Sequence, residues 1–306
     1  MLSAYLLVSH GSSDPRHKAG LSRIANTMRQ HLDWSLCDDL QTAPTALSRG
    51  LTSRHYTRPY PAKTPNFSPL RPRQVPSYPT LPPTPIVGTA TLEATHRPLA
   101  EQIEMFAKRV AAQGFRQVII VPLFLMAGVH VKEDLPQEIA IAQRLIPNRI
   151  NLLCLPHLGS HSSFTHFVAS RLKTTTADRC LLLAHGSRRH ASNRSVRQLG
   201  ASLDAEVAFW SVAPDLETQI IEMMQQGYQH IAIAPYFLFP GSITDAITRR
   251  TEDIAERLSQ LSLRLLAPLG TSTDLGRAVA EIVLGASPSG AWEPDHLTVA
   301  ESGLTA

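Results

Sequence analysis

The chain carries one pattern twice, and this duplication limits the folds that are open to it. Residues 6–12 read LLVSHGS and residues 181–187 read LLLAHGS. The same order continues with PLFLMAG at 122–128 and PYFLFPG at 235–241, and then with LGS at 158–160 and LGT at 269–271. Three landmarks in one order indicate two copies of a single fold. Residues that serve the fold should persist in both copies, whereas residues that serve chemistry need not.

Each copy alternates short apolar runs with amphipathic segments. Apolar runs that do not alternate with polar residues are typical of parallel strands covered on both faces by helices. The expected strands are residues 5–9, 86–93, 117–123, 151–155, 180–184, 206–211, 230–235 and 263–267. The 3.6-residue period predicts helices at 18–32, 97–113, 135–145, 162–172, 191–203, 215–226, 244–258 and 273–284. The sequence therefore predicts an α/β fold of two tandem doubly wound parallel-sheet domains with a cleft between them.

The repeat also sets the expected domain organisation. We expect an N-terminal domain that carries the active site at 1–156, its duplicate at 157–286 with elements near 157–178 open to exchange, and a peripheral tail at 287–306. One segment, 35–85, has no counterpart in the second copy and is rich in proline. Proline lacks an N–H group and this segment has few large aliphatic residues, so it cannot sustain helix or sheet hydrogen bonds or bury much apolar surface. We expect a surface insertion that is extended or disordered.

The composition excludes several classes of protein. A net charge of +4 without a Lys/Arg block is too weak to indicate nucleic acid. No run approaches the ~18 apolar residues of a membrane span, and the first residues lack the basic region of a signal peptide. Cys37, Cys154 and Cys180 form no CxxC pair, which argues against a zinc ribbon or an iron–sulfur cluster and suits a reducing cytoplasm. The oligomeric state is not predicted.

Polar residues at the carboxyl ends of the strands differ between the copies. Open parallel sheets bind their ligands beyond these ends, so these positions are the ones to compare. The N-terminal copy offers His10, Glu93 and His130. The C-terminal copy, aligned on its apolar landmarks, offers His185, Trp210 and Ile243. The second copy therefore keeps one of the three polar side chains.

Two imidazoles and a carboxylate have a definite chemical use. Neutral imidazoles bind Fe²⁺, Co²⁺, Ni²⁺ and Zn²⁺, and three ligands leave coordination positions open, so that the metal can be passed on. Each residue also has a purely structural interpretation: His10 in a strand-to-helix turn, Glu93 as a solvated carboxylate, and His130 as a packed core histidine. Their occurrence at one predicted edge favours a metal site in the N-terminal copy.

Other polar residues surround this edge. Candidate ligand-binding residues are Ser12, Arg16, Lys132, His185, Arg188 and Arg189. Arginines at a helix N-terminus can pair with ligand carboxylates, although an exposed basic turn explains them as well. The residues 132–134 after His130 either support that histidine or form the first turn of a solvated helix. A looser histidine group around another strand end, His157, His161 and His166, leaves a second metal site open.

These residues resemble those of a known family. The His10-Gly11-Ser12 turn, Glu93, and the PLFL run that leads through Gly128 to His130 resemble the class II chelatases, most of all the two-domain sirohydrochlorin chelatases. The resemblance covers both copies, without the proline-rich insertion and the tail. It implies an enzyme that inserts Fe²⁺ or Co²⁺ into sirohydrochlorin, an acidic tetrapyrrole, in sirohaem or cobalamin biosynthesis, with no tightly bound cofactor.

The resemblance also assigns roles. His10 and His130 would hold the incoming metal and Glu93 would assist, while one imidazole or Glu93 accepts the two pyrrole protons. Basic residues at the edge would receive the substrate carboxylates. The chain lacks the His-rich region and the C-terminal Cys-x-x-Cys motif of the long cobaltochelatases, which favours iron slightly and leaves Co²⁺ and Ni²⁺ open.

Two other functions remain open at this stage. A carrier that binds a metal or tetrapyrrole without catalysis would use the same ligands. A histidine phosphatase of the phosphoglycerate mutase type would carry Arg-His-Gly at the strand end, whereas Ser9 precedes His10 here. Metal insertion by the purified protein would separate the enzyme from the carrier.

Overall fold

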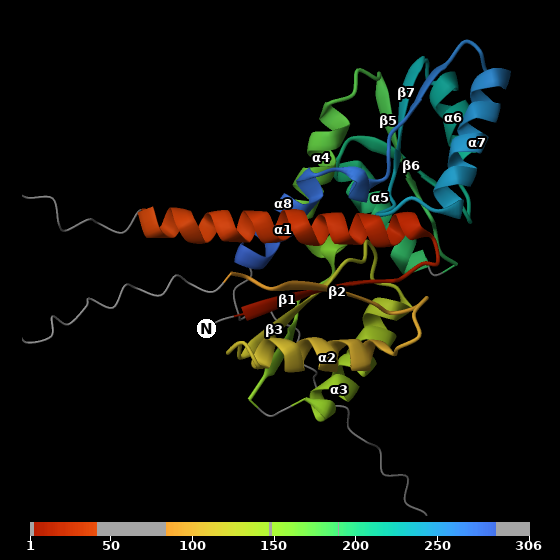
Figure 1. The fold of residues 1–306 in the computed structure, drawn as a ribbon. Helices are drawn as coiled ribbons and strands as arrows, with labels where there is room; N and C mark the ends of the chain where they lie inside the picture. Colours follow the sequence, from red (N-terminus) through yellow and green to blue (C-terminus); the bar gives the residue numbers. More distant parts are fainter. Residues whose placement is uncertain (1–2, 42–83, 147–148, 189, 286–306) are drawn as a thin grey trace, which may run out of the picture. The chain divides into compact units, whose positions relative to one another are not determined.

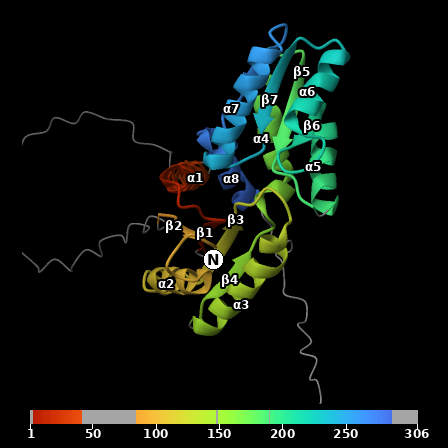
Figure 2. The same ribbon diagram turned by 90° about the vertical axis from the view of Figure 1, so that its right-hand side faces the viewer.

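The computed structural model of the protein describes residues 3–41, 84–146, 149–188 and 190–285. These residues form two four-stranded parallel sheets flanked by helices (Figures 1 and 2). The predicted α/β class with two tandem doubly wound sheets is therefore confirmed. Within the described residues, no helix is both long enough and apolar enough to cross a membrane.

The elements follow one another in the same order in both halves. The strands are β1 (Ser3–Ser9), β2 (Val87–Thr91), β3 (Gln117–Pro122) and β4 (Asn151–Cys154), then β5 (Arg179–Ala184), β6 (Ala205–Phe209), β7 (His230–Pro235) and β8 (Ser262–Leu265). The helices are α1 (Pro15–Gln41), α2 (Leu99–Ala111), α3 (Leu135–Leu145), α4 (Ser162–Lys173), α5 (His190–Ser202), α6 (Leu216–Gln225), α7 (Ser242–Arg257) and α8 (Asp274–Gly285). A π-helical turn, η1 (His130–Asp134), precedes α3, and short 3₁₀ turns η2 (Leu158–Ser160) and η3 (Leu269–Thr271) follow β4 and β8.

Strand order creates a crevice at the centre of each sheet. The first sheet runs β2-β1-β3-β4 and the second runs β6-β5-β7-β8. The chain moves outward in one direction from β1 to β2 and then crosses back to β3, so β1 and β3 lie at the point where the order reverses. Ligands of doubly wound folds bind at this switch point, beyond the carboxyl ends of the two strands. In the first sheet, β1 leads directly into His10 and β3 leads to the segment that carries His130.

Helices cover both faces of each sheet, as the apolar strands require. One face of the first sheet packs on α2 and α3, through residues such as Ile103 and Ile139. Its other face packs on α1 through Leu21, Ile24 and Met28. The same hydrophobic cluster continues to α4, α8 and one face of the second sheet, while α6 and α7 cover the opposite face of that sheet. The two sheets thus share a common apolar layer.

The structure changes some expected boundaries. Helix α1 runs from Pro15 to Gln41, whereas the sequence predicted 18–32, so its last turns occupy the start of the expected insertion at 35–85. The proline-rich residues 42–83 and the tail at 287–306 lie outside the described residues. The other helices and strands lie within a few residues of their predicted positions, and α3 and β7 have the predicted bounds. The π-helical turn at His130 was not predicted.

Candidate metal centre

The three predicted ligands come from three consecutive strand ends. His10 follows β1, Glu93 lies two residues beyond β2, and His130 opens η1 after β3. The backbone N–H of Glu93 donates to the carbonyl of His10 at 2.7 Å, which continues the β1–β2 pairing by one rung past the strands. This rung fixes Glu93 beside His10.

A glycine makes this close approach feasible. Gly11 has a φ of 100°, in the left-handed region that side chains with a Cβ disfavour. A Cβ at this position would lie 2.1 Å from the carbonyl oxygen of Glu93. The glycine in the HGS motif therefore serves both the turn and the placement of the carboxylate.

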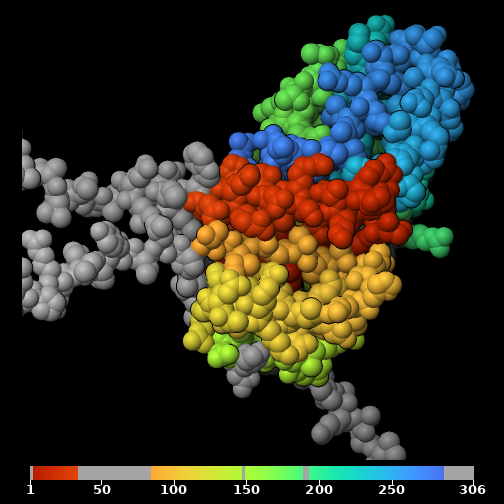
Figure 3. All heavy atoms as spheres, viewed as in Figure 1, coloured from red at the N-terminus to blue at the C-terminus, as the bar shows by residue number. Residues whose placement is uncertain are grey.

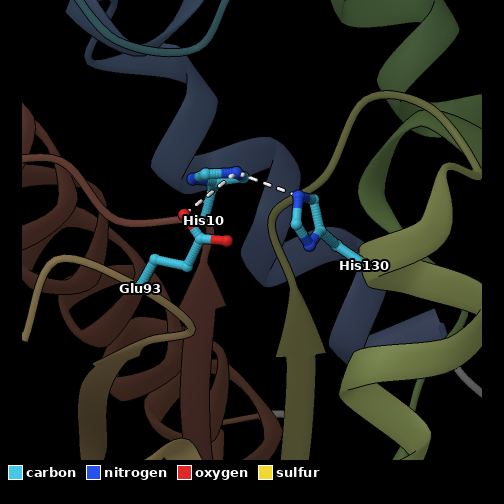
Figure 4. Close-up of side chains that lie close together, drawn as sticks. All are labelled: His10, Glu93 and His130. Carbon is cyan, nitrogen blue, oxygen red and sulfur yellow. Dashed lines mark hydrogen bonds and ion pairs between the residues drawn. The ribbon is translucent and has the colours of Figure 1, made fainter.

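Side chains of the three residues converge at the crevice (Figure 4). The Nε2 atoms of His10 and His130 are 3.1 Å apart, and the His10 Nε2 lies 3.8 Å from a carboxylate oxygen of Glu93. One ligand atom from each residue lies within 4.8 Å of the other two, and this is the only such group among the described residues. His10 and Glu93 are exposed and His130 is half-buried, so an ion can reach them from solvent. The predicted convergence is present.

Hydrogen bonds at the far side of each ring define its tautomer. The Nδ1 of His130 lies 2.7 Å from the Asp134 carboxylate, and the Nδ1 of His10 lies 3.2 Å from the Gly11 carbonyl. Both partners are acceptors, so in the neutral imidazoles the proton resides on Nδ1. The two Nε2 lone pairs then face one another and the Glu93 carboxylate. Three electron-rich groups in this geometry repel unless a cation lies between them.

The second half lacks the equivalent group. His185 follows β5 and places its Nδ1 2.9 Å from the Gly186 carbonyl, so its ring is held as that of His10 is. The strand pairing corrects one assignment. The N–H of Ser211 donates to the carbonyl of His185, just as the N–H of Glu93 donates to the carbonyl of His10. The counterpart of Glu93 is therefore Ser211 and not Trp210. Alignment of the two helices does not show this offset, because the connections between strand and helix differ in length. Neither Ser211 nor Ile243 supplies an imidazole or a carboxylate.

A cavity of 660 Å³ opens in front of His10 and His130. His10 and His130 lie on its wall together with His185 from the second half. Facing apolar segments line much of the rest, 123–126 after β3 and 236–240 after β7. These are the two copies of the repeated apolar motif, so the duplication places matching walls on one cavity.

The remaining predicted ligand-binding residues have different outcomes. Ser12 lines the cavity, but its Oγ accepts from the N–H of Asp14 at 3.1 Å, as a capping residue does. Arg16 is engaged by two carboxylates, Asp14 at 2.6 Å and Asp245 at 2.7 Å, which accounts for its charge without a ligand. Lys132 and Arg188 are exposed and do not line the cavity, whereas Arg189 lies outside the described residues.

The separate histidine group does not form a metal site among the described residues. His157 turns its Nδ1 to the Phe124 carbonyl at 3.1 Å, and His161 turns its Nε2 to the Pro156 carbonyl at 3.0 Å. Burial lowers the pKa of His157, so that histidine is neutral and serves the fold.

One residue that matters here was only a neighbour in the sequence. Asp134 lies four residues after His130, and η1 brings the two side chains together as an (i, i+4) pair. Sequence reasoning left residues 132–134 undecided between support for His130 and a solvated turn. The structure assigns the supporting contact to Asp134.

Fold and site together define a duplicated, doubly wound α/β protein of the class II chelatase type, as the resemblance implied. The chain belongs to the CbiX family, whose family model matches residues 77–175 and 179–285. These segments contain both repeats except for the first strand and helix of the chain.

Individual relatives support this assignment. A sirohydrochlorin ferrochelatase from Priestia megaterium is 25% identical over 174 residues, a match that spans 53% of this chain and 65% of that protein. The structure of SirB from Bacillus subtilis with Fe³⁺ has a TM-score of 0.61 at 18% identity and covers 93% of this chain and 95% of that one. A SirB chelatase from Bacillus subtilis subspecies spizizenii in complex with cobalt has a TM-score of 0.55 at 19% identity, covering 92% and 93%. The two structures show that the fold is shared.

Proposed function

We propose that the protein is a sirohydrochlorin chelatase, an enzyme that inserts a divalent metal into the tetrapyrrole. The observation that carries this proposal is the convergence of the two Nε2 lone pairs and the Glu93 carboxylate at the β1/β3 switch point. Membership of the CbiX family and the name of the Priestia megaterium relative support the choice of substrate.

In the proposed reaction, His10 and His130 hold the incoming ion and Glu93 assists. Metal insertion exchanges M²⁺ for two pyrrole protons, so a base must lie close to the reacting centre. Glu93 is exposed and within 3.8 Å of His10, which suits it to accept a proton as the metal leaves. Because three ligands leave coordination positions open, the pyrrole nitrogens can replace them one after another.

The cavity supplies the orientation of the macrocycle. Its two apolar segments, 123–126 and 236–240, suit the faces of a flat ring system, and His185 lies on the side of the second half. Positioning of this kind accounts for a large part of catalysis when two reactants must meet in one geometry. Of the predicted ligand-binding residues, Ser12 and His185 lie at the wall and are available for substrate carboxylates.

Iron is the proposed physiological metal, with cobalt as the second choice. The relative from Priestia megaterium is named a ferrochelatase, and the sequence lacks the motifs of the long cobaltochelatases. The free thiols of Cys154 and Cys180 agree with the proposed cytoplasmic location.

Anaerobic turnover with purified protein, sirohydrochlorin and Fe²⁺ tests the proposal. We expect the absorption spectrum of the macrocycle to change to that of the metallated product faster than without protein. Parallel reactions with Co²⁺ and Ni²⁺ rank the metals. A carrier would bind both partners and leave the insertion rate at its uncatalysed value, and this result would overturn the proposal.

Substitutions locate the activity in the first half. We expect His10→Ala and His130→Ala to lower the insertion rate by at least about a hundredfold, since each removes a ligand in the proposed site. His185→Ala is the matched control, because it removes the equivalent histidine from the half that has no partner ligands. An equal loss in the His185→Ala variant would show that the roles of the two halves are wrongly assigned.

A further inference from the structure

A second cavity lies away from the metal centre, on the open edge of the first sheet. It measures 620 Å³ and is formed by α1, β2 and α2, whose surfaces adjoin on the face shown in Figure 3. This volume lies within the 300–1,000 Å³ that is typical of small-molecule sites. Neither His10, Glu93 nor His130 lines it. We call it the edge groove.

Three arginines, Arg29, Arg97 and Arg109, line the edge groove without a carboxylate among the described residues around them. Each guanidinium is held by neutral groups. Arg29 donates to the Val87 carbonyl at 2.9 Å, Arg97 contacts the sulfur of Met105, and Arg109 lies over the Phe106 ring at 5.2 Å from its centroid. None of the three forms an ion pair with a described residue. Their positive charges therefore remain available to a ligand.

The floor of the groove depends on a residue without a side chain. A Cβ at Gly88 would lie 2.4 Å from the Phe106 ring, so the glycine lets this ring pack against β2 and support Arg109. In the second half the equivalent strand position is Glu206, which pairs with Arg179 at 3.1 Å. The duplicated edge thus has its own carboxylate at the position where the first edge has a glycine under the Phe106 ring.

Backbone groups along β2 restrict the kind of ligand. The N–H of Tyr5 donates to the Ile86 carbonyl, and alternate residues of a parallel strand face the same neighbour, so Val87, Thr89 and Thr91 face outward. The Gln102 amide occupies both the N–H and the carbonyl of Thr91, and Arg29 occupies the carbonyl of Val87. An added strand would therefore find only the N–H of Val87 and the backbone groups of Thr89 open among these three residues. The edge is closed to a peptide strand and open to a compact molecule.

The sequence between α1 and β2 supplies no counter-charge. Residues 42–84, which join α1 to β2 in the sequence, contain several arginines and no aspartate or glutamate. Planar guanidinium groups bind carboxylate and phosphate oxygens in a bidentate manner, so a cluster of three selects a ligand with several such groups.

We propose that the edge groove is a binding site for a small polyanion that carries two or more carboxylate or phosphate groups. Its charged groups are bound by Arg97 just before α2, by Arg109 on α2 and by Arg29 on α1. The N–H of Thr89 is available to one further oxygen. This site is separate from the metal centre, and the proposal does not depend on the chelatase activity.

Calorimetric titration of the full chain with pyrophosphate and with tricarballylate tests the proposal at low ionic strength. We expect one saturable site, with at least about tenfold weaker binding in Arg97→Gln and in Arg109→Gln, because each loses a charge-assisted hydrogen bond. The preferred probe distinguishes a phosphate from a carboxylate ligand. The matched control is Arg144→Gln, which removes the same charge from the exposed surface of α3.

Several outcomes would overturn the proposal. One is that neither probe binds in a saturable manner, and another is that both groove variants keep the affinity of the wild type. A third is an equal loss of affinity in Arg144→Gln, which would indicate general charge attraction. A loss of binding in His10→Ala would place the anion at the metal centre instead. Melting temperatures confirm that the variants fold. On the unaltered protein, bound probe should slow phenylglyoxal modification of Arg97 and Arg109 but not of Arg144.

Discussion

Asp134 holds the imidazole ring of His130 in place. Its carboxylate accepts from the Nδ1 of His130 at 2.7 Å, and this fixes both the orientation of the ring and the nitrogen that carries the proton. Histidines that bind metals commonly donate their second N–H in this way, and loss of the acceptor lowers metal affinity. Asp134 is thus a positioning residue, because it touches the imidazole and not the proposed ion.

We expect Asp134→Ala to weaken Co²⁺ binding by about 10- to 100-fold, because His130 loses its orienting acceptor. Asp134→Asn should lose less Co²⁺ affinity, since the amide oxygen of asparagine can still accept from the Nδ1 of His130. Titration followed by calorimetry measures both. Glu101→Gln removes one negative charge from an exposed position on α2 and controls for charge alone. If Asp134→Ala binds as the wild type does, the orienting role is wrong.

The turn from β1 into α1 positions two of the three candidate ligands, His10 and Glu93. Gly11 takes up a left-handed conformation, and the Glu93 carbonyl lies where a Cβ would be. The sequence marks this turn as HGS in both halves, but the reason for its glycine is visible only when β2 is placed beside it. A small change in this turn should therefore affect two ligands at once.

We expect Gly11→Ala to lower both stability and metal affinity. Alanine pays about 1–2 kcal/mol for a left-handed backbone, and its Cβ must also displace the Glu93 backbone. Gly114→Ala is the matched control, because Gly114 has a φ of 90° but no atom within 4 Å of a Cβ. Urea unfolding and metal titration of the two variants separate the effects. Equal results for both would show that the contact with Glu93 is unimportant.

On the scale of the whole molecule, apolar packing along α1 joins the two halves among the described residues. The Phe239 ring lies edge-on to His17 at 4.4 Å between centroids, and Gly20 leaves the space beside it. Arg16 adds an ion pair with Asp245, but both side chains are more than 40% exposed. Exposed ion pairs contribute little to stability, so the apolar contact should dominate.

We expect Phe239→Ala to lower the free energy of unfolding by about 2 kcal/mol or more, since it removes a large side chain from a packed contact. Asp245→Asn should have a smaller effect, which shrinks further at high salt. Urea denaturation at two salt concentrations measures both variants. A larger loss for Asp245→Asn would mean that the ion pair joins the halves.

The buried histidines should make the stability of the chain depend on pH. Burial lowers the pKa of His17, whose Nε2 lies 3.2 Å from the Ser9 hydroxyl, and it lowers the pKa of His157 as well. Both values fall below the ordinary 6.5, so the unfolded chain binds more protons in mildly acidic solution. Stability is therefore full above pH 6.5 and declines as the pH falls below it.

Unfolding free energies measured between pH 7.5 and pH 5 test this expectation. The slope of the unfolding free energy against pH should be smaller in His17→Gln, because the glutamine cannot take up a proton on unfolding. The decrease should correspond to at most one proton. His157→Gln should decrease the slope in the same direction, because burial lowers the pKa of His157 as well. A slope that is the same in His17→Gln as in the wild type would contradict the assignment.

Much of this fold and part of its site can be predicted from periodicity and repetition. Apolar runs mark the strands because both faces of a parallel sheet are buried, and His10 and Glu93 follow such runs directly. The expected pairing of Glu93 with Trp210 was wrong, because helix alignment does not report the register of β2 on β1 and of β6 on β5. Arg16 was predicted to bind a ligand, but its two carboxylates come from separate parts of the chain.

Sequence patterns thus predicted the repeat, the α/β class and the three candidate ligands, because short runs of residues mark the strands, the strand ends and the repeated motifs. Strand order, the π-helical turn that joins His130 to Asp134, and the uncompensated arginines of the edge groove became known only from the folded chain. Each depends on contacts between distant segments, and such contacts leave no period or motif in the sequence. The physical reason is that burial is encoded residue by residue, whereas distances between side chains arise only when the elements pack.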